Sequence, residues 1–193
     1  MNKITATCAS ALDPIDEYVC GGLKGNRVHS LVIGRSDATL VIAASGVCPT
    51  VADFQVGMTA TEVVVLTHIS NGLIDEVGSS ELTDLDTESG LPEKFNIQMG
   101  ITGNIKHPTS DVYARTMEYN LNPLLKVWVI DNKGYIWGGE TGYLTNGLNA
   151  FSPKKMDGTT QMISFNLVYI ADDVLDDSLY DADALTLDNA AAA

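Results

Sequence analysis

The chain has 193 residues, 45% of them hydrophobic, and carries 25 acidic against 11 basic residues for a formal net charge of −14. This length and apolar content suit one folded domain rather than a disordered polymer. Excess carboxylates repel nucleic-acid phosphates and anionic lipids, so specific DNA binding and membrane-surface binding are not expected. An acidic wall would still let DNA pass as non-specific cargo.

The N-terminal region and the cysteines indicate no targeting signal and no redox motif. Residues 1–26 lack the apolar core of a signal peptide, and no run approaches the roughly 20 residues of a membrane span. We expect a protein made in the cytoplasm, with residues 1–26 as an N-terminal arm. Cys8, Cys20 and Cys48 lack CxxC spacing, which favours reduced thiols, with Cys48 a small buried one.

Strands dominate the first part of the region that we assign to a β-rich core domain, residues 27–170. The β-branched runs 27–34 and 38–44 are joined by a three-residue link, which predicts a hairpin. The valine-rich run 62–70 predicts a third strand that ends at an Asn-Gly pair. Between these strands lies a Thr-x-x-Asp capping pattern, Thr50 to Asp53, which predicts one or two helical turns.

An acidic segment follows. Residues 71–93, NGLIDEVGSSELTDLDTESGLPE, are rich in Gly and Ser and predict a long exposed loop, which in a compact domain is usually functional or disordered. From residue 36 to residue 93 there are ten acids and no Lys or Arg. Solvated carboxylates such as those of the loop lack the burial that acid–base catalysis requires.

The second half of the chain predicts one helix and a closing strand. Residues 95–103 alternate apolar and polar residues, the pattern of a half-buried strand. Residues 109–121 follow a helix-start signal, repeat apolar residues at helical spacing and end before Pro123, so they predict the only substantial helix. The apolar run 161–170 predicts a final strand.

The stretch KVWVIDNKGYIWGGETGYLTNG, residues 126–147, has the clearest pattern. A calcium loop fails because Lys133 occupies a position that needs an oxygen ligand. A phosphate loop fails because the glycines lack the required lysine and carry Glu140 instead. A β-hairpin fits, with the Asp-Asn-Lys-Gly turn at residues 131–134 and a bend or bulge at the following glycine pair.

No pattern in the chain predicts an active site or a cofactor site. The histidines, His29, His68 and His107, are isolated and match no zinc spacing, although a site assembled in space remains open. No GxSxG elbow is present, and no GxGxxG follows a strand. We expect no enzyme, no cofactor and no metal.

The last residues, 171–193, contain seven Asp and no base. Such a segment is not expected to pack by itself. Two interpretations stay open: a solvated acidic tail, and an arm that a neighbouring subunit orders.

The order of these elements resembles that of virion structural proteins of tailed bacteriophages, tail-tube subunits above all. The resemblance covers residues 27–170 and rests on the strands, the acidic excursion, the single helix, the hairpin with its D-x-K-G turn and W-G-G, and the final strand. It implies a mainly β (α+β) fold, a β-sandwich or barrel-like domain with one flanking helix, a long acidic loop and extended termini.

The resemblance also implies a function. The chain would be a virion subunit, made in the host bacterial cytoplasm, that joins copies of itself and other virion proteins through shared strands, loops and termini. An acidic tube lumen would let DNA slide without sticking. The alternatives are a head or decoration protein, and a β-sandwich module for glycans or a host surface with aromatic stacking platforms. The candidate interface residues are Asp75, Glu76, Asp84, Asp86, Glu88, Trp128 and Trp137.

Overall fold

The computed structural model describes residues 27–38, 40, 48–82, 93–156, 160–171 and 178–187. The predicted N-terminal arm, Cys8 and Cys20 lie outside these ranges, and Cys48 is buried as expected. The elements in chain order are β1 (Val28–Arg35), α3 (Val51–Thr59), β2 (Val63–Leu66), β3 (Ile69–Leu82), β4 (Glu93–Lys106), α4 (Ser110–Tyr119), β5 (Leu125–Asp131), β6 (Tyr135–Trp137), β7 (Tyr143–Thr145), β8 (Phe151–Met156), β9 (Thr160–Ala171), β10 (Ser178–Tyr180) and the 3-10 helix η1 (Ala184–Thr186).

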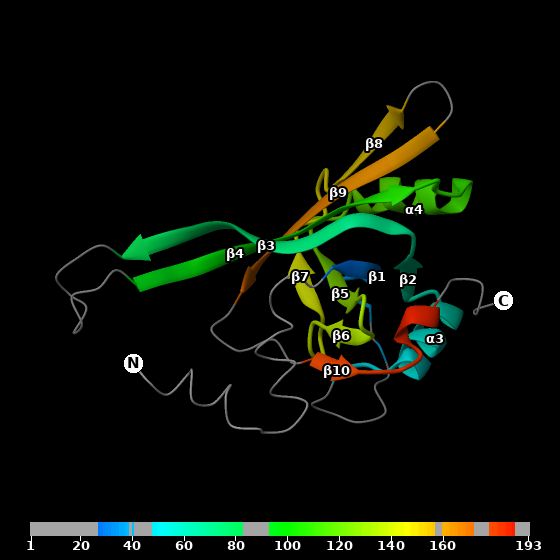
Figure 1. The fold of residues 1–193 in the computed structure, drawn as a ribbon, viewed down its shortest axis with the longest axis horizontal. Helices are drawn as coiled ribbons and strands as arrows, with labels where there is room; N and C mark the ends of the chain where they lie inside the picture. The colour runs from blue at the N-terminus through cyan, green and yellow to red at the C-terminus, as the bar shows by residue number, and fades with distance from the viewer. Residues whose placement is uncertain are drawn as a thin grey trace.

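The strands form two open antiparallel sheets. Sheet A has the order β10-β6-β5-β1-β2, with β7 also paired to β5, and sheet B has the order β3-β4-β9-β8. In Figure 1 sheet B lies above sheet A, and two of its hairpins, β3–β4 and β8–β9, reach beyond the rest of the body. The prediction of a mainly β fold is confirmed, as two open sheets rather than a closed barrel.

Sheet A is buried on both of its faces. One face packs on sheet B and forms an inter-sheet core, and the other packs on α3 and η1 and forms a helix-side core. Strand β5 divides its side chains between the two: Val127 and Val129 enter the inter-sheet core, whereas Trp128 and Ile130 enter the helix-side core. Because successive side chains of a strand point to opposite faces, a strand that is apolar at every position fits this central place.

The predicted hairpin is confirmed. Strand β5 turns at Asp131 and returns as β6, and Gly134 has the positive φ of 91° that the turn requires. The buried Asp131 carboxylate accepts hydrogen bonds from the backbone N–H groups of Lys133 at 2.8 Å and Tyr135 at 3.0 Å. The side chain therefore closes the turn from inside, as Asx side chains do.

The predicted strands at residues 95–103 and 161–170 are also confirmed, as parts of β4 and β9. The run 161–170 is not the final strand, because β10 follows it. The helix predicted at residues 109–121 is α4, with Thr109 as its N-cap. It is not the only helix: the Thr50–Asp53 pattern forms a complete capping box and opens the nine-residue α3. The reason is that α3 packs Phe54 and Met58 into the helix-side core, which stabilises it beyond two turns.

Two strand predictions are wrong in their boundaries. In the predicted strand 38–44, Ala38 and Leu40 are not in a strand, and residues 39 and 41–44 lie outside the described residues. The described partners of β1 are β2 and β5. The run 62–70 is not one strand either. It breaks at Thr67 and His68, where His68 has a φ of 59°, and β3 then begins in the other sheet.

The predicted loop 71–93 is wrong for its first part, because β3 continues through Asn71-Gly72 to Leu82. The Asn-Gly pair forms a bulge instead of a turn, marked by a register shift between Ser70 and Leu73. A Cβ at Gly72 would lie 2.6 Å from Val28 Cβ, so glycine permits β3 to cross closely over β1.

Part of the acidic C-terminal region packs on the body, which neither interpretation of a tail or a neighbour-ordered arm describes. Strand β10 pairs with β6, and Ala184 and Leu187 are buried in the helix-side core. The Asp181 carboxylate accepts a hydrogen bond of 3.0 Å from the Val51 N–H at the start of α3. Within the described residues, no helix is long and apolar enough to span a membrane.

Candidate assembly surfaces

The β3–β4 hairpin is the most extended feature of the described chain. Each strand has 14 residues, roughly 45 Å at the usual rise per residue. Figure 1 shows its far end projecting past the other strands and helices, toward the left of the view. We call the described end of this hairpin, residues 75–82 of β3 and 93–98 of β4, the arm. Strand β3 is the outermost strand of sheet B, so the arm presents a long strand edge.

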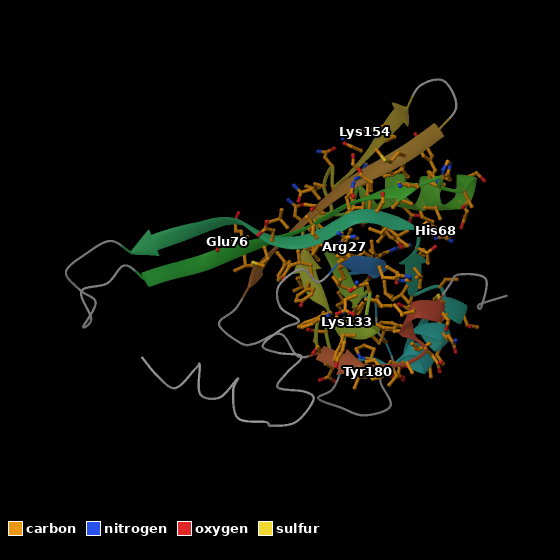
Figure 2. The ribbon with its side chains drawn as sticks, in the orientation of Figure 1. Arg27, His68, Glu76, Lys133, Lys154 and Tyr180 are labelled. Atoms are coloured by element: carbon orange, nitrogen blue, oxygen red, sulfur yellow. The ribbon has the colours of Figure 1, made fainter. Side chains whose placement is uncertain are left out.

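The arm carries two of the predicted interface acids. Asp75 and Glu76 are exposed on β3, opposite Gly100 and Met99 of β4, and Figure 2 shows Glu76 at the root of the arm. The other predicted acids, Asp84, Asp86 and Glu88, lie outside the described residues. In the sequence, β3 leads directly into that acidic segment.

The two tryptophans do not lie together, and neither is an open aromatic platform. Trp128 is 1% exposed, stacks edge-on against Phe54 at 5.6 Å and donates from Nε1 to the Gly139 carbonyl at 3.0 Å. Trp137 is half-buried on the opposite face of sheet A, against the inter-sheet core, and its Nε1 lies 3.3 Å from Asp131 Oδ2. Trp128 is therefore a core residue, and a role of Trp137 at an interface stays a prediction.

The two free edges of sheet B differ. At the β8 edge, the Asn120 side chain accepts from the Phe151 N–H and donates to the Phe151 carbonyl, both at 2.7 Å, as a neighbouring strand would. Pro153, two residues on, has no N–H to offer. At the β3 edge there is no such cap in the described residues, but three register shifts interrupt the ladder to β4. Edge pairing is therefore hindered at β8 and less so at β3.

The outer face of sheet B, which points away from the inter-sheet core, is not covered by any described helix or strand. Its middle rows carry uncharged side chains, including the exposed Leu73 and Ile170. Its charged side chains lie at the two ends. Asp75 stands toward the arm, and Lys106 and Lys154 stand toward the β8–β9 end, each opposite Met162 of β9. We call the three residues Lys106, Met162 and Lys154 the basic row.

A second exposed apolar area lies where the loop after α4 meets the loop after β7. The backbone joins these loops through a hydrogen bond from the Asn149 N–H to the Asn120 carbonyl. Exposed leucines project from both segments and from β7, and Leu121 is the most exposed at 79%. The members of this leucine cluster are Leu121, Leu124, Leu144 and Leu148.

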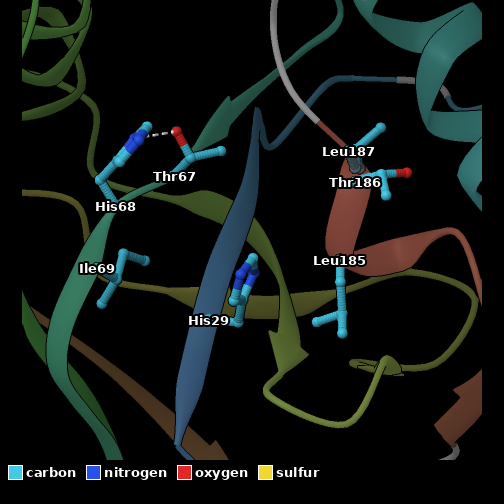
Figure 3. A pocket seen from close by; sticks show the side chains of 7 residues that line it. All are labelled: His29, Thr67, His68, Ile69, Leu185, Thr186 and Leu187. Carbon is cyan, nitrogen blue, oxygen red and sulfur yellow. Dashed lines mark hydrogen bonds between the residues drawn. The ribbon is translucent and has the colours of Figure 1, made fainter.

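One hollow lies between β1, the β2–β3 corner and η1, and Figure 3 shows its lining. Its volume is about 300 Å³, and its walls are His29, Thr67, His68, Ile69, Leu185, Thr186 and Leu187. His29 Nδ1 lies 3.2 Å from Ser30 Oγ, and His68 Nδ1 lies 2.9 Å from Thr67 Oγ1. No carboxylate or thiol lines it, and the described residues contain no group of three or more metal-ligating side chains. His107, the third histidine, is exposed elsewhere, at the end of β4.

One titratable group in α4 is strongly affected by the fold. Burial raises the pKa of Tyr119 to about 12, with smaller effects from Arg115 and Arg35, which lower it, and from Glu118, which raises it. Tyr119 packs against Phe151 at 6.4 Å in the inter-sheet core. Its role is to fill the space between α4 and β8 rather than to exchange protons.

Sequence reasoning missed the basic row, the leucine cluster and the Asn120 cap. Lys106 and Lys154 lie far apart in sequence and meet only because β4 and β8 flank β9 in a particular register. No local pattern marks that register. A signal did exist for the row: Lys154-Lys155 is the only basic pair in a strongly acidic chain.

No protein-family model matches this chain, and no curated protein sequence matches it. Among solved structures, it is similar to a chain in the tail of an empty gene transfer agent (GTA) particle with C6 symmetry. That match has a TM-score of 0.38 and 12% identity, and it covers 64% of this chain and 90% of that one. A chain of the virion of a native GTA particle matches at TM-score 0.41 and 10% identity, covering 62% and 90%. The likeness to phage-like particle components is distant by sequence, and no functional argument rests on it.

Proposed function

We propose that this chain is a structural subunit of a tailed-phage type of particle, a tail-tube subunit that assembles with copies of itself and with other virion proteins. The observation that carries the proposal is the arm: paired strands of a length unusual for a small domain, extended away from both cores. A hairpin of this length gains little free energy when it becomes ordered in water without a partner. It becomes favourable when a neighbouring subunit covers it.

Two further surfaces support self-assembly. The outer face of sheet B is uncovered in the described part of the chain and holds the exposed Leu73 and Ile170, and the leucine cluster adds a separate apolar area. Soluble monomers rarely keep large contiguous apolar patches, whereas subunits of assemblies bury them. Two separate surfaces on one chain suit a heterologous contact, which generates rings or tubes from identical copies.

The net charge of −14 supports a role for the acids in the assembled tube. A lumen lined with carboxylates would repel DNA phosphates and let the genome slide through. Charge reversal of Asp84, Asp86 and Glu88 to Lys is expected to impair DNA delivery while assembly persists. Normal infectivity of such particles would contradict the acidic lumen without affecting the structural role.

A structural role also agrees better with the molecule than the alternatives do. The hollow at His29 and His68 has a lining of imidazoles, threonines and apolar groups, which lacks the acid or thiol that most hydrolytic mechanisms use. A glycan-binding module needs exposed aromatic platforms, and neither predicted tryptophan supplies one, because Trp128 is inside the core and Trp137 is half-buried; the exposed aromatics are tyrosines such as Tyr180. A head or decoration protein would share the assembly surfaces and would form shells rather than tubes.

The test is electron microscopy and sedimentation velocity of the purified full chain over a range of concentrations. We expect rings or tubes, and a chain that stays monomeric at high concentration would contradict the proposal. A matched variant replaces residues 77–98 by an Asn-Gly turn between Glu76 and Met99, which stand opposite each other. This variant should remain folded, with a melting temperature close to that of the unaltered chain, and should fail to assemble.

A further inference from the structure

The hollow between β1, the β2–β3 corner and η1 brings together two of the three histidines of the chain. His29 and His68 each stand two residues beyond the Leu31–Leu66 pair of the β1–β2 ladder, so the antiparallel register carries both to the same end of these strands. The ladder stops before them, and both imidazoles line the one hollow. In the view of Figure 3 the His29 ring lies between His68 and the η1 segment.

Irregular backbone places each of these histidines. His29 is the extra residue of a β-bulge, because Val28 and Ser30 on either side of it pair with two consecutive residues of β5. His68 has a φ of 59°, in the left-handed region that residues with a side chain rarely adopt. Bulges re-aim side chains, and backbone departures of both kinds gather at ligand sites. The fold thus deviates twice to bring imidazoles to this hollow.

The hydrogen bonds of the two rings leave one nitrogen of each ring available. His29 Nδ1 lies 3.2 Å from Ser30 Oγ, and His68 Nδ1 lies 2.9 Å from Thr67 Oγ1. A hydroxyl oxygen that accepts a bond from Nδ1–H selects the tautomer whose Nε2 carries a lone pair, which is the form that binds metal ions. Within the described residues neither Nε2 has a hydrogen bond or an ion pair.

The remaining lining selects the kind of ligand. It consists of two threonine side chains and three aliphatic ones, Thr67, Thr186, Ile69, Leu185 and Leu187, with no carboxylate, thiol, Lys or Arg among the described lining residues. Ca²⁺ and Mg²⁺ need several oxygen ligands, whereas imidazole suits Zn²⁺, Cu²⁺ and Ni²⁺. The volume of about 300 Å³ has room for such an ion and several waters, each of about 30 Å³. The net charge of −14 attracts cations to the protein.

We propose that this hollow binds one transition-metal dication of the Zn²⁺ class through the Nε2 atoms of His29 and His68, with waters as the other ligands. The Ser30 and Thr67 hydroxyls hold the two rings in the binding orientation. The ion ties β1 to the corner where the chain passes from sheet A to sheet B. Because the protein supplies two ligands, the site binds more weakly than structural zinc sites with four. This inference is independent of the proposed function.

Calorimetric titration of the reduced full chain with Zn²⁺ tests the two ligands. His29→Ala removes one ligand, and His68→Asn removes the other while keeping a residue type that tolerates a positive φ. Each should weaken binding by at least about 10-fold, and Thr67→Val, which removes only the hydroxyl behind His68, by up to about 10-fold.

His107→Asn is the matched control for these titrations. His107 is exposed at the end of β4, has a φ of 50° and does not line the hollow. Its replacement should shift the affinity for Zn²⁺ by less than about 2-fold, because it supplies no ligand. Equal weakening by His107→Asn and His68→Asn, or full affinity in His29→Ala, would refute the site.

X-ray absorption at the zinc edge identifies the atoms that hold the ion in the full chain. We expect nitrogen and oxygen neighbours at about 2.0–2.1 Å, with the outer scattering of imidazole rings. A sulfur shell near about 2.3 Å would show that cysteine thiolates bind the zinc and would overturn the inference.

Thermal melting gives a further readout that does not depend on assembly. Zn²⁺ at about 100 times its dissociation constant should raise the melting temperature of the unaltered chain by roughly 5–10 °C. The variant His29→Ala/His68→Asn should lose this rise, and Ca²⁺ or Mg²⁺ at the same concentration should give none. No rise with Zn²⁺, or an equal rise with Ca²⁺, would contradict the inference and leave the proposed function standing.

Discussion

The two sheets of this molecule are built for different tasks. Sheet A has short strands, is covered on both faces and contains the central strand β5, whose side chains are buried on each side. Sheet B has strands of up to 14 residues, is covered on one face and extends beyond its own core. The difference teaches that stability resides in sheet A and the body of sheet B, whereas the outer face and arm of sheet B are available for contacts with other molecules.

The largest expected effect comes from the centre of sheet A. Trp128→Ala removes a side chain that fills the space between β5, α3 and the 138–142 bend, where Gly142 lies close against the indole ring. It should lower the free energy of unfolding by about 3–5 kcal/mol, measured by urea denaturation. Leu144→Ala, at an exposed site of the same sheet, is the control and should change it by less than about 0.5 kcal/mol. Similar losses of unfolding free energy in the two variants would contradict the view that stability resides in the core of sheet A.

The buried Tyr119 makes the contact between α4 and sheet B sensitive to alkali. Its folded-state pKa of about 12 exceeds the value of about 10 for an exposed phenol, so the folded state favours the neutral form. This contribution is complete below pH 10 and is lost as the pH rises from about 10 to about 12, on the order of 2–3 kcal/mol. Thermal melts across this range should show a steeper loss of stability for the unaltered chain than for Tyr119→Phe. Parallel curves of melting temperature against pH for the two proteins would contradict this prediction.

A smaller effect is expected at the capped edge of sheet B. Asn120→Ala leaves the N–H and carbonyl of buried Phe151 without their partner and should lower the free energy of unfolding by about 1–3 kcal/mol. Asn122→Ala removes only an exposed bond to the Glu118 carbonyl and should have an effect below about 0.5 kcal/mol. Urea denaturation measures the free energy of unfolding of both variants. Equal losses would show that the Asn120 cap has no special role.

The smallest effect on folding is expected on the outer face of sheet B. Ile170→Ser should change the free energy of unfolding by less than about 0.5 kcal/mol, because the side chain is 59% exposed. Leu167→Ser, on the inward face of the same strand, should lower it by roughly 3 kcal/mol or more. If Ile170→Ser is as destabilising as Leu167→Ser, the outer face belongs to the core and the comparison between the sheets fails.

Much of sheet A could be predicted because its signals are local. The Asp-Asn-Lys-Gly turn predicts the β5–β6 hairpin within a few residues, and the Thr50–Asp53 pattern predicts the start of α3. The course of β3 could not be predicted, because Asn71-Gly72 is the usual sequence of a turn. Only the close passage over Val28, a contact distant in sequence, makes it a bulge.

The candidate surfaces also divide into features with a local sequence signal and features set by contacts distant in sequence. The sequence shows that acids gather at residues 71–93, and the structure places the first of them, Asp75 and Glu76, exposed on the arm. The basic row is a product of sheet register, and a shift of one residue between β8 and β9 would point Lys154 to the other face. Composition therefore predicted an acidic surface, and only the pairing of strands shows where two of its lysines meet.

The C-terminal segment has a consequence for synthesis on the ribosome. Residues 178–187 add the last strand to β6 and place Ala184 and Leu187 beside Phe54 and Trp128. A nascent chain in which these residues are still inside the ribosome leaves that core open on one side, so the body is incomplete until residues 178–187 emerge. The helix-side core therefore closes only after strands β1 to β9 have emerged, which couples the folding of Trp128 and Phe54 to residues far along the chain.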